Sequence, residues 1–494
     1  MKDDASKQQA DLDREFASTT TLHGIGRVIE SSRALVKLIW LTILLVCLGV
    51  CIWQITDRFR RYFKYEATTA VSVEYVGDLD FPAVTICNFN RYRLSVLTEA
   101  DIASLEVLLE YTDYDYDTYD DPETPGEEPN PNEPAANFSY TEFTERTGFI
   151  LDERTLMDCK WRGKKDSCKA HNFTHEFTSF GNCWTFNSGE DSDENDLPIL
   201  HQIQPGSGNG LRMIIDIQQH EYAEPVQGGN LEAGLKVLVH GQETPPSVDA
   251  EGFAIGPGVH AFVGVRKREY NNLEEPWGRC DETKTLTHYE KYTLQGCSIE
   301  CKAKKIYENC ECRLVRHPGN EIECSPKQVK NCATPVLTQL KAGEIKDCEC
   351  PVPCNYSEFR TSLSTAVLPN NNVMEELWKL YSPDDFANYT DDQSGLYIRE
   401  NWILLDVFYE SLNFEKYVQS EAISASALIS DIGGQLGLFL GASFITMTEI
   451  LEYLGRKAGR FFTSCSQRTT INPIKTRPRE DTIGIKDLPS SSGS

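Results

Sequence analysis

An uncharged apolar run of 19 residues, from Leu38 to Thr56, lies near the start of this 494-residue chain. A helix needs about 20 apolar residues to cross the hydrocarbon core of a bilayer. A signal peptide is the competing interpretation. It fits poorly, because the run follows 37 largely polar residues and ends in Trp53 and basic residues without a small-residue cleavage site. We therefore expect a transmembrane helix over residues 38–57.

A second apolar run extends over residues 422–453 and is interrupted by charged residues only at Asp431, Glu449 and Glu452. As a straight helix it would be about 45 Å long, more than one bilayer core, so it must tilt or break. Basic residues after the second run predict that this end of the run faces the cytoplasm. The basic residues after the first run would instead place the segment between the runs in the cytoplasm. We expect a second transmembrane helix over residues 422–454, both termini in the cytoplasm, and a largely disordered tail over residues 455–494.

The segment between the runs has the composition of an extracellular domain. It contains 14 of the 17 cysteines, an even number as disulfides require. It also contains all four Asn-x-Ser/Thr sequons, at Asn137, Asn172, Asn355 and Asn388. Residues 58–421 are therefore expected to be a glycosylated, cysteine-rich domain in an oxidising compartment.

This segment is also strongly acidic, with 34 basic and 63 acidic residues between the runs. Nucleic acid is excluded as a partner by this charge. A solvated acidic surface is one interpretation. The alternative is a field that concentrates cations near a pore mouth, or carboxylates crowded enough to titrate near neutral pH.

Periodicity predicts an α+β fold in the extracellular segment. Apolar, β-branched runs between turn residues predict strands at 81–90, 211–217, 235–240 and 401–412, and the pieces between residues 211 and 262 suggest an antiparallel sheet. Helical spacing predicts helices at 98–111, 294–310 and 373–381. Residues 113–134 are rich in acid and proline and are expected to form an exposed loop.

Four cysteines have spacings that predict how they pair. Cys297 and Cys301 are four residues apart on an expected helix, and Cys348 and Cys350 are two apart on an expected strand. Both spacings place two side chains about 6 Å apart on one face, so nested rungs, 297 with 350 and 301 with 348, would join helix to strand. A zinc site is the alternative, but the compartment favours oxidation.

Motifs for catalysis are missing from the sequence. It contains no glycine-rich phosphate loop, His-Glu-x-x-His helix or nucleophile elbow, and its nine histidines are scattered. We expect no enzyme activity, no catalytic residue, no cofactor and no metal site. An extracellular enzyme is an alternative without support.

The stretch "SDIGGQLGLFLGAS", residues 430–443, combines an aspartate with four glycines inside the second run. The glycines fit a Gly-x3-Gly packing seam. An aspartate at this depth, however, needs water or a partner. We expect a cation pore in an oligomer, and the seam is the alternative. The residues that would share the pore-facing side of a helix are Asp431, Gly434 or Gln435, Leu438, and Gly441 or Ala442.

Four motifs resemble those of the acid-sensing ion channels in the degenerin and epithelial sodium channel family. They are His23-Gly24, "FPAVTICN" after the first run, the cysteine array from Cys280 to Cys354, and "DIGGQLGLFLGAS". The resemblance covers nearly the whole chain. It implies a homotrimeric, sodium-selective, amiloride-sensitive channel of the plasma membrane. Its α+β ectodomain would be hand-like, with palm, knuckle, finger, β-ball and thumb.

The resemblance also implies roles for single residues. The second transmembrane helix would break at Gly441, Ala442 and Ser443, the narrow part of the pore, below an outer gate at Asp431 and Gly434. His23 and Gly24 would belong to a re-entrant segment that lines the lower pore. Gating would use a contact between Trp277 and Tyr65, and a linker at Leu412 and Asn413. The implied disulfides are Cys87–Cys183, Cys159–Cys168, Cys280–Cys354, Cys297–Cys350, Cys301–Cys348, Cys310–Cys332 and Cys312–Cys324.

The sequence departs from the family pattern at residues that would sense protons, the expected gating stimulus. Thr334 and Thr338 stand where two thumb aspartates are expected, Ala67 replaces a proton-sensing histidine, and Gln204 replaces its partnering lysine. Fewer crowded carboxylates should weaken a response to mild acid. The remaining candidate proton-sensing carboxylates are Glu221, Asp406, Glu74, Glu410 and Glu415.

The expected function is therefore a ligand-gated sodium channel in the lipid bilayer, with weak proton gating. Its expected partners are sodium ions, protons or another extracellular ligand, and amiloride-like blockers. A peptide-gated channel of the same family is one alternative, and a non-conducting two-span receptor is another. An ATP-gated trimer is a third, but it needs a basic phosphate-binding cluster that the acidic segment does not obviously offer.

Overall fold

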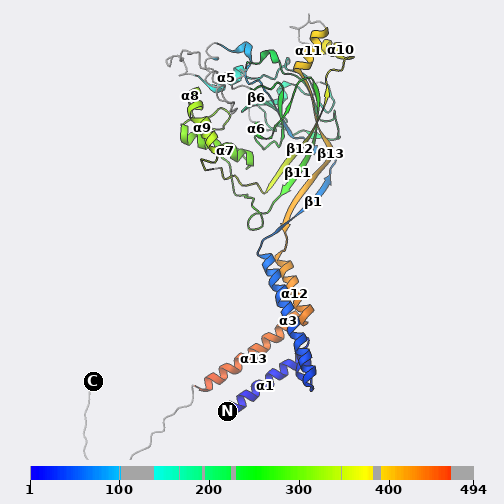
Figure 1. The fold of residues 1–494 in the computed structure, drawn as a ribbon, viewed down its shortest axis with the longest axis vertical. Helices are drawn as coiled ribbons and strands as arrows, with labels where there is room; N and C mark the ends of the chain where they lie inside the picture. Colours follow the sequence, from blue (N-terminus) through cyan, green and yellow to red (C-terminus); the bar gives the residue numbers. More distant parts are fainter. Residues whose placement is uncertain are drawn as a thin grey trace, which may run out of the picture. The chain divides into compact units, whose positions relative to one another are not determined.

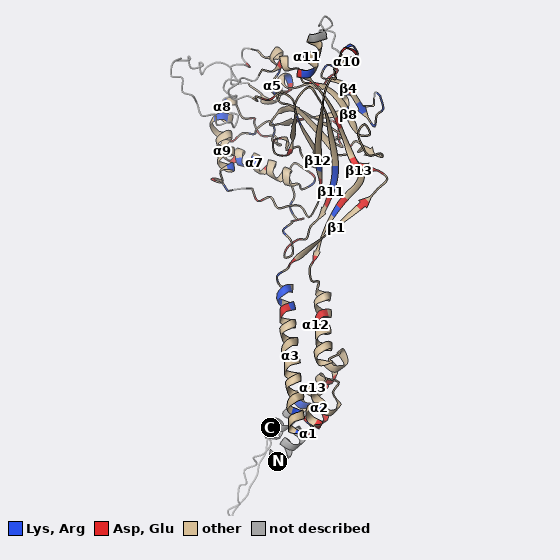
Figure 2. Cartoon of the chain, turned by 45° about the vertical axis from the view of Figure 1, so that its right-hand side comes forward, with Lys and Arg blue, Asp and Glu red and all other residues tan. Residues whose placement is uncertain are grey.

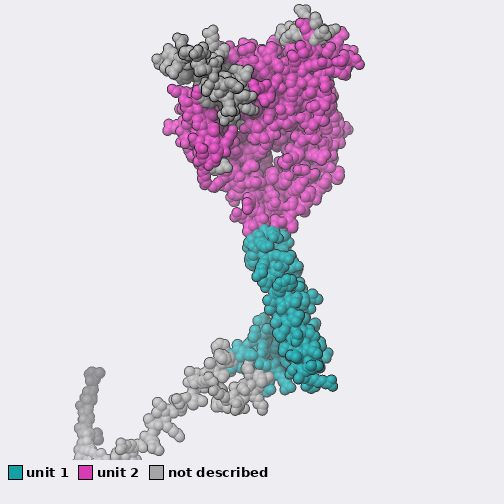
Figure 3. All heavy atoms as spheres, in the orientation of Figure 1, with its two compact units in different colours: residues 1–66, 422–494 teal, residues 67–421 magenta. Residues whose placement is uncertain are grey.

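The computed structural model describes residues 2–98, 101, 138–165, 167–191, 195–223, 230–346, 348–381 and 391–468. Within these ranges side chains are described from residue 11 to residue 460, apart from residues 391 and 392. The expected acidic loop, most of the expected helix at 98–111, the sequons at Asn137 and Asn388 and the end of the tail lie outside the described residues. The chain forms two compact units, residues 1–66 with 422–494 and residues 67–421 (Figure 3).

The first unit is helical (Figure 1). Among the described residues, one single helix, α3, is long and apolar enough to cross a bilayer, and it extends the expected span at both ends. Helices α12 and α13 meet the same test as a pair bent by 76°. The bounds are α1 (Lys2–Thr19), α2 (Ile25–Glu30), α3 (Ala34–Tyr62), α12 (Ala425–Leu440) and α13 (Phe444–Arg468).

The larger sheet of the second unit has six strands, in the order β12-β11-β13-β8-β4 with β1 also paired to β13. Strand β13 is longer than expected because its first part pairs with β8 and its last part with β1. Strands β11 and β13 run parallel, whereas the other pairs of this sheet are antiparallel. The bounds are β1 (Ala67–Tyr75), β4 (Leu156–Trp161), β8 (Leu211–Asp216), β11 (Val259–Asn271), β12 (Asn355–Val367) and β13 (Trp402–Glu421).

A five-stranded antiparallel sheet, in the order β10-β9-β3-β6-β5, packs against the first sheet. Every residue of β3 is buried, as its continuous apolar run predicts. A separate two-stranded sheet is formed by β2 and β7. The bounds are β2 (Leu79–Asp80), β3 (Ala83–Asn88), β5 (Phe173–Thr178), β6 (Gly181–Phe186), β7 (His201–Gln202), β9 (Leu235–His240) and β10 (Phe253–Ile255).

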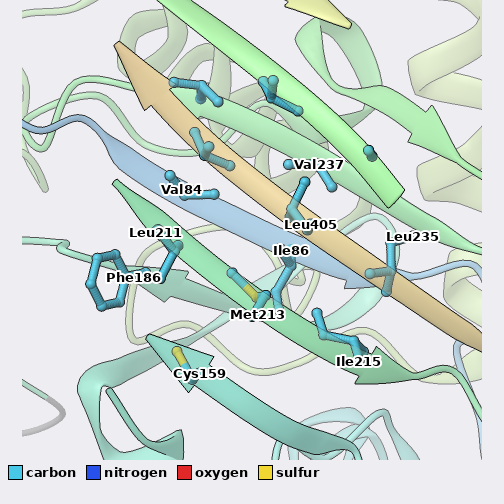
Figure 4. Packing of buried hydrophobic residues seen from close by; sticks show 14 of the residues in the cluster. Val84, Ile86, Cys159, Phe186, Leu211, Met213, Ile215, Leu235, Val237 and Leu405 are labelled. Carbon is cyan, nitrogen blue, oxygen red and sulfur yellow. The ribbon is translucent and has the colours of Figure 1, made fainter. Parts of the chain in front are cut away.

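The main hydrophobic core lies between these two sheets (Figure 4). Ile86 and Val237 of the five-stranded sheet and Met213 and Leu405 of the six-stranded sheet are all fully buried. Such burial stabilises the fold by roughly 1.5–3 kcal/mol per large apolar side chain. The core therefore fixes the strands that carry the polar groups considered below.

Helix α7 is the longest helix of the second unit and has the bounds that the sequence predicted. The Thr293 hydroxyl caps its start by accepting a hydrogen bond from the Gly296 amide at 3.0 Å. The helices and helical turns in the described part of this unit are η1 (Leu94–Val96), α5 (Tyr140–Thr147), η3 (Ala170–Asn172), η4 (Gln219–Glu221), α6 (Val248–Glu251), α7 (Leu294–Cys310), α8 (Pro326–Gln328), η5 (Val329–Ala333), α9 (Thr334–Lys341), α10 (Met374–Tyr381) and α11 (Asp391–Asn401).

Seven disulfides join fourteen cysteines of the second unit, in the pairs that the resemblance implied. The two nested rungs have Cα separations of 5.8 Å for Cys297–Cys350 and 6.0 Å for Cys301–Cys348. The expectation of a strand at Cys348 and Cys350 is wrong, since neither residue belongs to a strand. The Cys350 amide instead donates to the Cys348 carbonyl, a local turn.

Candidate functional site

Helix α12 ends at a glycine in the left-handed conformation. Gly441 has φ of 69°, which L side chains rarely adopt. The amides of Gly441 and Ala442 donate to the carbonyls of Gly437 and Leu436 at 3.0 and 3.2 Å. These bonds satisfy carbonyls at the helix end, so the chain can leave the helix here.

The next helix, α13, begins with a reciprocal cap. The Ser443 hydroxyl accepts from the Thr446 amide at 3.3 Å, and the Thr446 hydroxyl accepts from the Ser443 amide at 3.0 Å. This is the pattern of a capping box, with threonine in place of glutamate. The Gly-Ala-Ser sequence thus contains both a stop for one helix and a start for the next.

The His-Gly segment lies against this joint. The His23 amide donates to the Leu440 carbonyl at 2.9 Å. A Cβ atom added to Gly441 would lie 2.5 Å from the His23 ring. Gly24 also has a left-handed φ, of 90°, and an added Cβ there would lie 3.1 Å from Leu44. His23 and Leu440 therefore meet at the end of α12, although they are 417 positions apart in the sequence.

Hydroxyl groups and a carboxylate continue this contact along α13. Glu449 accepts from the Thr21 amide at 3.0 Å and from the Thr20 hydroxyl at 3.3 Å. The Thr21 hydroxyl lies 2.6 Å from that of Thr446, which is fully buried. Sequence reasoning treated Glu449 only as an interruption of the second run, because its partners lie more than 400 residues away.

Helix α1 is held to α13 by a second cluster. Asp13 accepts from the Tyr453 hydroxyl at 2.6 Å and from Lys457 at 3.2 Å. The ring of Phe16 stacks on Tyr453 with centroids 4.4 Å apart. The N-terminal segment is therefore ordered by the second half of the bent pair.

The predicted pore-facing residues of α12 do not all share one environment in the single chain. Asp431 lies 3.5 Å from Arg58 of α3, and each side chain is about two-fifths exposed. Leu438 is 76% exposed, and a Cβ added to Gly434 would meet no atom within 4 Å. Arg58 is thus the partner that an aspartate at this depth requires. A pore-facing role for Asp431, Gly434 and Leu438 stays a prediction.

Two of the candidate carboxylates are held by arginines of β11. Glu410 accepts from Ser362 and from Arg266, and the Ser362 hydrogen bond is the main reason that its pKa lies below the usual range. Glu415 accepts from the Tyr417 hydroxyl at 2.9 Å and from Arg268 at 2.8 Å, and the tyrosine is the main reason that its pKa is lowered.

Lowered pKa values keep both carboxylates ionised in mild acid, which argues against them as sensors near neutral pH. The opposite charges of strands β11 and β13 are visible in Figure 2.

The other three candidates also have hydrogen-bonded or ionic partners. Glu74 lies 3.6 Å from Lys416. Asp406 is fully buried and accepts from the Ser207 hydroxyl and the Gly208 amide. Glu221 accepts from the Ser95 amide at 2.9 Å. The five candidates therefore have separate partners, and their role as sensors stays a prediction.

The predicted gating residues fall in both units. Tyr65 belongs to the first unit and packs against Tyr62, whereas Trp277 belongs to the second, so their contact stays a prediction. In β13, the Leu412 carbonyl accepts from the Val76 amide at 3.1 Å. Asn413 pairs in register with Tyr75 of β1 and accepts from the Ser411 hydroxyl.

The residues at which the sequence departs from the family pattern have ordinary local contacts. Thr334 and Thr338 share one face of α9, where the Thr338 hydroxyl donates to the Thr334 carbonyl at 3.0 Å. Ala67 pairs with Glu421 at the end of β1. The Gln204 carbonyl accepts from Gln202. The described sequons, Asn172 and Asn355, are exposed, and their glycosylation stays a prediction.

Sequence reasoning missed two carboxylates with raised pKa values. Burial raises the pKa of Asp216 to about 6, although it accepts from Tyr397 at 3.0 Å, Trp402 at 3.2 Å and the Gln218 amide. Burial likewise raises the pKa of Glu176, which accepts from Thr185, to about 7. No sequence signal marks either residue, since burial arises only after the strands assemble.

Asp216 is expected to make stability depend on pH. Its pKa is higher in the folded chain than in the unfolded chain, so protonation favours folding. This contribution is fully present below about pH 4 and is lost as pH rises through about 6, a change of about 3 kcal/mol. Melting temperatures of wild type and Asp216→Asn, compared at pH 4.5 and 7.5, should show the wild type losing more stability at the higher pH. Equal changes in both would contradict the expectation.

Comparison with known proteins gives relatives over most of the chain. Residues 16–453 match the family described as amiloride-sensitive sodium channel. The chain is 36% identical over 453 residues to acid-sensing ion channel 2 of Homo sapiens, covering 89% of this chain and 85% of that protein. It is 35% identical over 448 residues to acid-sensing ion channel 1B of Danio rerio, covering 89% and 76%. It is 34% identical over 464 residues to the bile acid-sensitive ion channel of Rattus norvegicus, covering 90% and 87%.

One solved structure, a proton-activated chloride channel, aligns with a TM-score of 0.29 and 7% identity over 86% of this chain and 96% of that chain, which is too low to carry an argument. The family match spans the apolar helix α3, helix α12, the first part of α13 up to residue 453, and all seven disulfides. The relatives are ion channels and not enzymes. The chain belongs to the amiloride-sensitive sodium channel family.

Proposed function

We propose that the chain forms a homotrimeric, sodium-selective channel of the plasma membrane, with both termini in the cytoplasm and residues 58–421 outside. The observation that supports it most is the joint between α12 and α13, where left-handed Gly441 meets His23. Backbone that leaves a helix at membrane depth is tolerated where it lines a cavity, and freed carbonyls there can meet a cation. Membership of a sodium channel family supports the same function.

The ion path of this channel would run along the second span. Gly441, Ala442 and Ser443 form its narrow part, with Asp431, Gly434 and Leu438 above and His23 and Gly24 below. An aspartate from each copy would attract cations. The exposed glycines of α12 support assembly, because small residues let helices of neighbouring copies approach closely.

The ectodomain would open the channel by changing state in response to an extracellular ligand. We place the relay at Trp277 and Tyr65, with Leu412 and Asn413 controlling recovery. The ligand would be protons, a peptide or another small molecule, and the names of the relatives include both acid-sensing and bile acid-sensitive channels.

A bulky side chain at Gly434 is expected to hold the channel open. Added Cβ atoms at Gly434 and at Gly49 of α3 both meet no atom within 4 Å in the single chain. Gly434→Phe should therefore disturb only contacts between copies, and it should produce a standing sodium current that an amiloride-like compound blocks. Gly49→Phe is the matched control and should leave the current unchanged in voltage clamp. A silent Gly434→Phe channel at the cell surface would count against the proposed pore.

Acid is expected to activate the channel only weakly, with half-activation below about pH 6. Glu410 and Glu415 have lowered pKa values, and Thr334 and Thr338 supply no carboxylate. A proton concentration–response curve in voltage clamp measures this directly. A robust current half-activated above about pH 6.5, where an ordinary histidine titrates, would refute weak proton gating.

A non-conducting two-span receptor is the remaining alternative. It places no functional demand on Asp431, so Asp431→Asn would leave its ligand response intact. In the proposed channel the same substitution removes a charge from the ion path and should lower sodium conductance. Single-channel recording of this variant therefore separates the two functions.

A further inference from the structure

A cavity of about 760 Å³ lies between α7 to α9 on one side and α5 with the turn between β5 and β6 on the other. Its volume is within the range of sites that take a small organic molecule, about 300–1,000 Å³. All of its described lining belongs to the second unit. The described lining contains five basic side chains, Arg91, Lys302, Arg313, Arg316 and Lys341, and one acidic side chain, Asp249.

This basic lining contrasts with the rest of the domain. Between the membrane spans the chain has nearly two acidic residues for each basic one, yet the described lining has five basic residues for one acidic residue. The cavity also includes Thr334, one of the two positions where the family resemblance led us to expect an aspartate. A site expected to attract cations is therefore lined by side chains that attract anions.

A buried histidine lies close to three of these basic side chains. His317 is 5% exposed, and burial lowers its pKa to about 3, helped by the charges of Arg316, Lys302 and Arg313. In the described part of the chain its Nδ1 atom has no hydrogen-bond partner, and neither does the buried Nε atom of Arg313. Tyr140 is close enough to Arg91 and Arg316 for both charges to act on it.

The remaining described wall combines apolar and aromatic side chains with hydroxyl groups and an amide. Tyr92, Tyr140, Phe180, Leu337 and Leu340 line the cavity, and the ring of Tyr92 lies beneath Arg91 at 5.9 Å. Guanidinium groups bind carboxylate or sulfonate oxygens in pairs, and rings and leucines accept an apolar body. We infer that this cavity binds an extracellular organic anion, an apolar body that carries a carboxylate or sulfonate group.

Such a ligand would touch both sides of the cavity at once. Lys302 of α7 and Leu337 of α9 lie on one side, and Tyr140 of α5 and Phe180 on the other. Binding would favour the arrangement in which these elements are closest, because the ligand contacts both only there. An effect on current rests on the proposed channel function, whereas binding itself does not.

The test uses the purified full chain in lipid nanodiscs and the fluorescent sulfonate 8-anilinonaphthalene-1-sulfonate as probe. Lys302→Gln with Arg316→Gln should raise the dissociation constant of the probe about tenfold or more, because two charges are removed. The matched control, Lys304→Gln with Lys327→Gln, removes the same amount of charge at two positions outside this cavity. It should change the dissociation constant of the probe less than about twofold. Added salt should weaken binding of the probe to the wild type and to the control. It should weaken binding to the Lys302 and Arg316 variant less, because two of the attracting charges are already removed there.

Any of four results would overturn the inference. The first is equal binding of the sulfonate to the wild type and to the Lys302 and Arg316 variant. The second is a loss of binding confined to the Lys304 and Lys327 variant, since Lys304 lines a separate cavity. The third is equally tight binding of the neutral analogue N-phenyl-1-naphthylamine, and the fourth is equally tight binding of inorganic phosphate. A chain that binds the probe as expected but carries no current would contradict the proposed channel and leave the site intact.

Discussion

Gly441→Ala is expected to reduce the sodium current more than about tenfold while the chain still folds and reaches the cell surface. The left-handed φ of 69° costs an L side chain about 1–2 kcal/mol. The new Cβ would also lie 2.5 Å from the His23 ring, so the ring must move. Moving it disturbs the hydrogen bond from the His23 amide to the Leu440 carbonyl. A cost of about 2 kcal/mol is enough to depopulate a conducting state more than tenfold.

Gly49→Ala is the matched control, at a glycine of the other apolar helix. Gly49 lies inside α3, and its added Cβ would meet no atom within 4 Å. Alanine also favours the helix by up to about 1 kcal/mol. The double variant His23→Ala with Gly441→Ala should recover part of the current, because it relieves the clash but not the backbone strain. Normal current from Gly441→Ala, measured beside surface labelling, would contradict this account of the joint.

Removal of both nested disulfides is expected to cost more than the sum of the two single removals. While one of the two disulfides is intact, the other closes only a short ring made of residues 297–301 and 348–350. Its removal then lowers the free energy of unfolding by about 2–3 kcal/mol. Loss of both also frees a loop of 47 residues, which adds about 4 kcal/mol. The total of about 6–7 kcal/mol is comparable to the whole stability of many domains.

Melting temperatures of the purified chain measure this difference. The variants are Cys297→Ser with Cys350→Ser, Cys301→Ser with Cys348→Ser, and all four together. Cys47→Ser, which removes a cysteine outside the disulfides, is the control and should melt like the wild type. If the decrease in melting temperature of the fourfold variant is no larger than the sum of the decreases of the two double variants, the rungs act independently and the expectation is wrong.

The elements that sequence reasoning predicted well depend on local signals. Helix α7 begins at a threonine cap and strand β9 is a short apolar run, and the bounds of both agree with the expectation. The nested rungs also followed from local spacing, since two cysteines on one face require two partners at a similar distance. In α7 and β9 the signal and the structure lie within a few residues of one another, whereas the rungs join cysteines 53 and 47 positions apart and only the spacing within each pair is local.

The parts that could not be predicted depend on partners far away in the sequence. Arg58 lies 373 positions before Asp431, and Asp13 lies 440 positions before the Tyr453 hydroxyl that it accepts from. The raised pKa of Asp216 requires α11 and β13 to bury it. The basic side chains of the cavity come from positions between 91 and 341, so the acidic overall composition gave no sign of them.

The reversal potential of the current carried by the Gly434→Phe chain tests the sodium channel most directly. The measurement is made in voltage-clamped cells, with external sodium replaced stepwise by potassium and then by a large organic cation. The proposed channel predicts a reversal potential that follows external sodium, with little inward potassium current. A current that reverses at the same potential whichever cation is outside, or no current at all from chains at the surface, would contradict it.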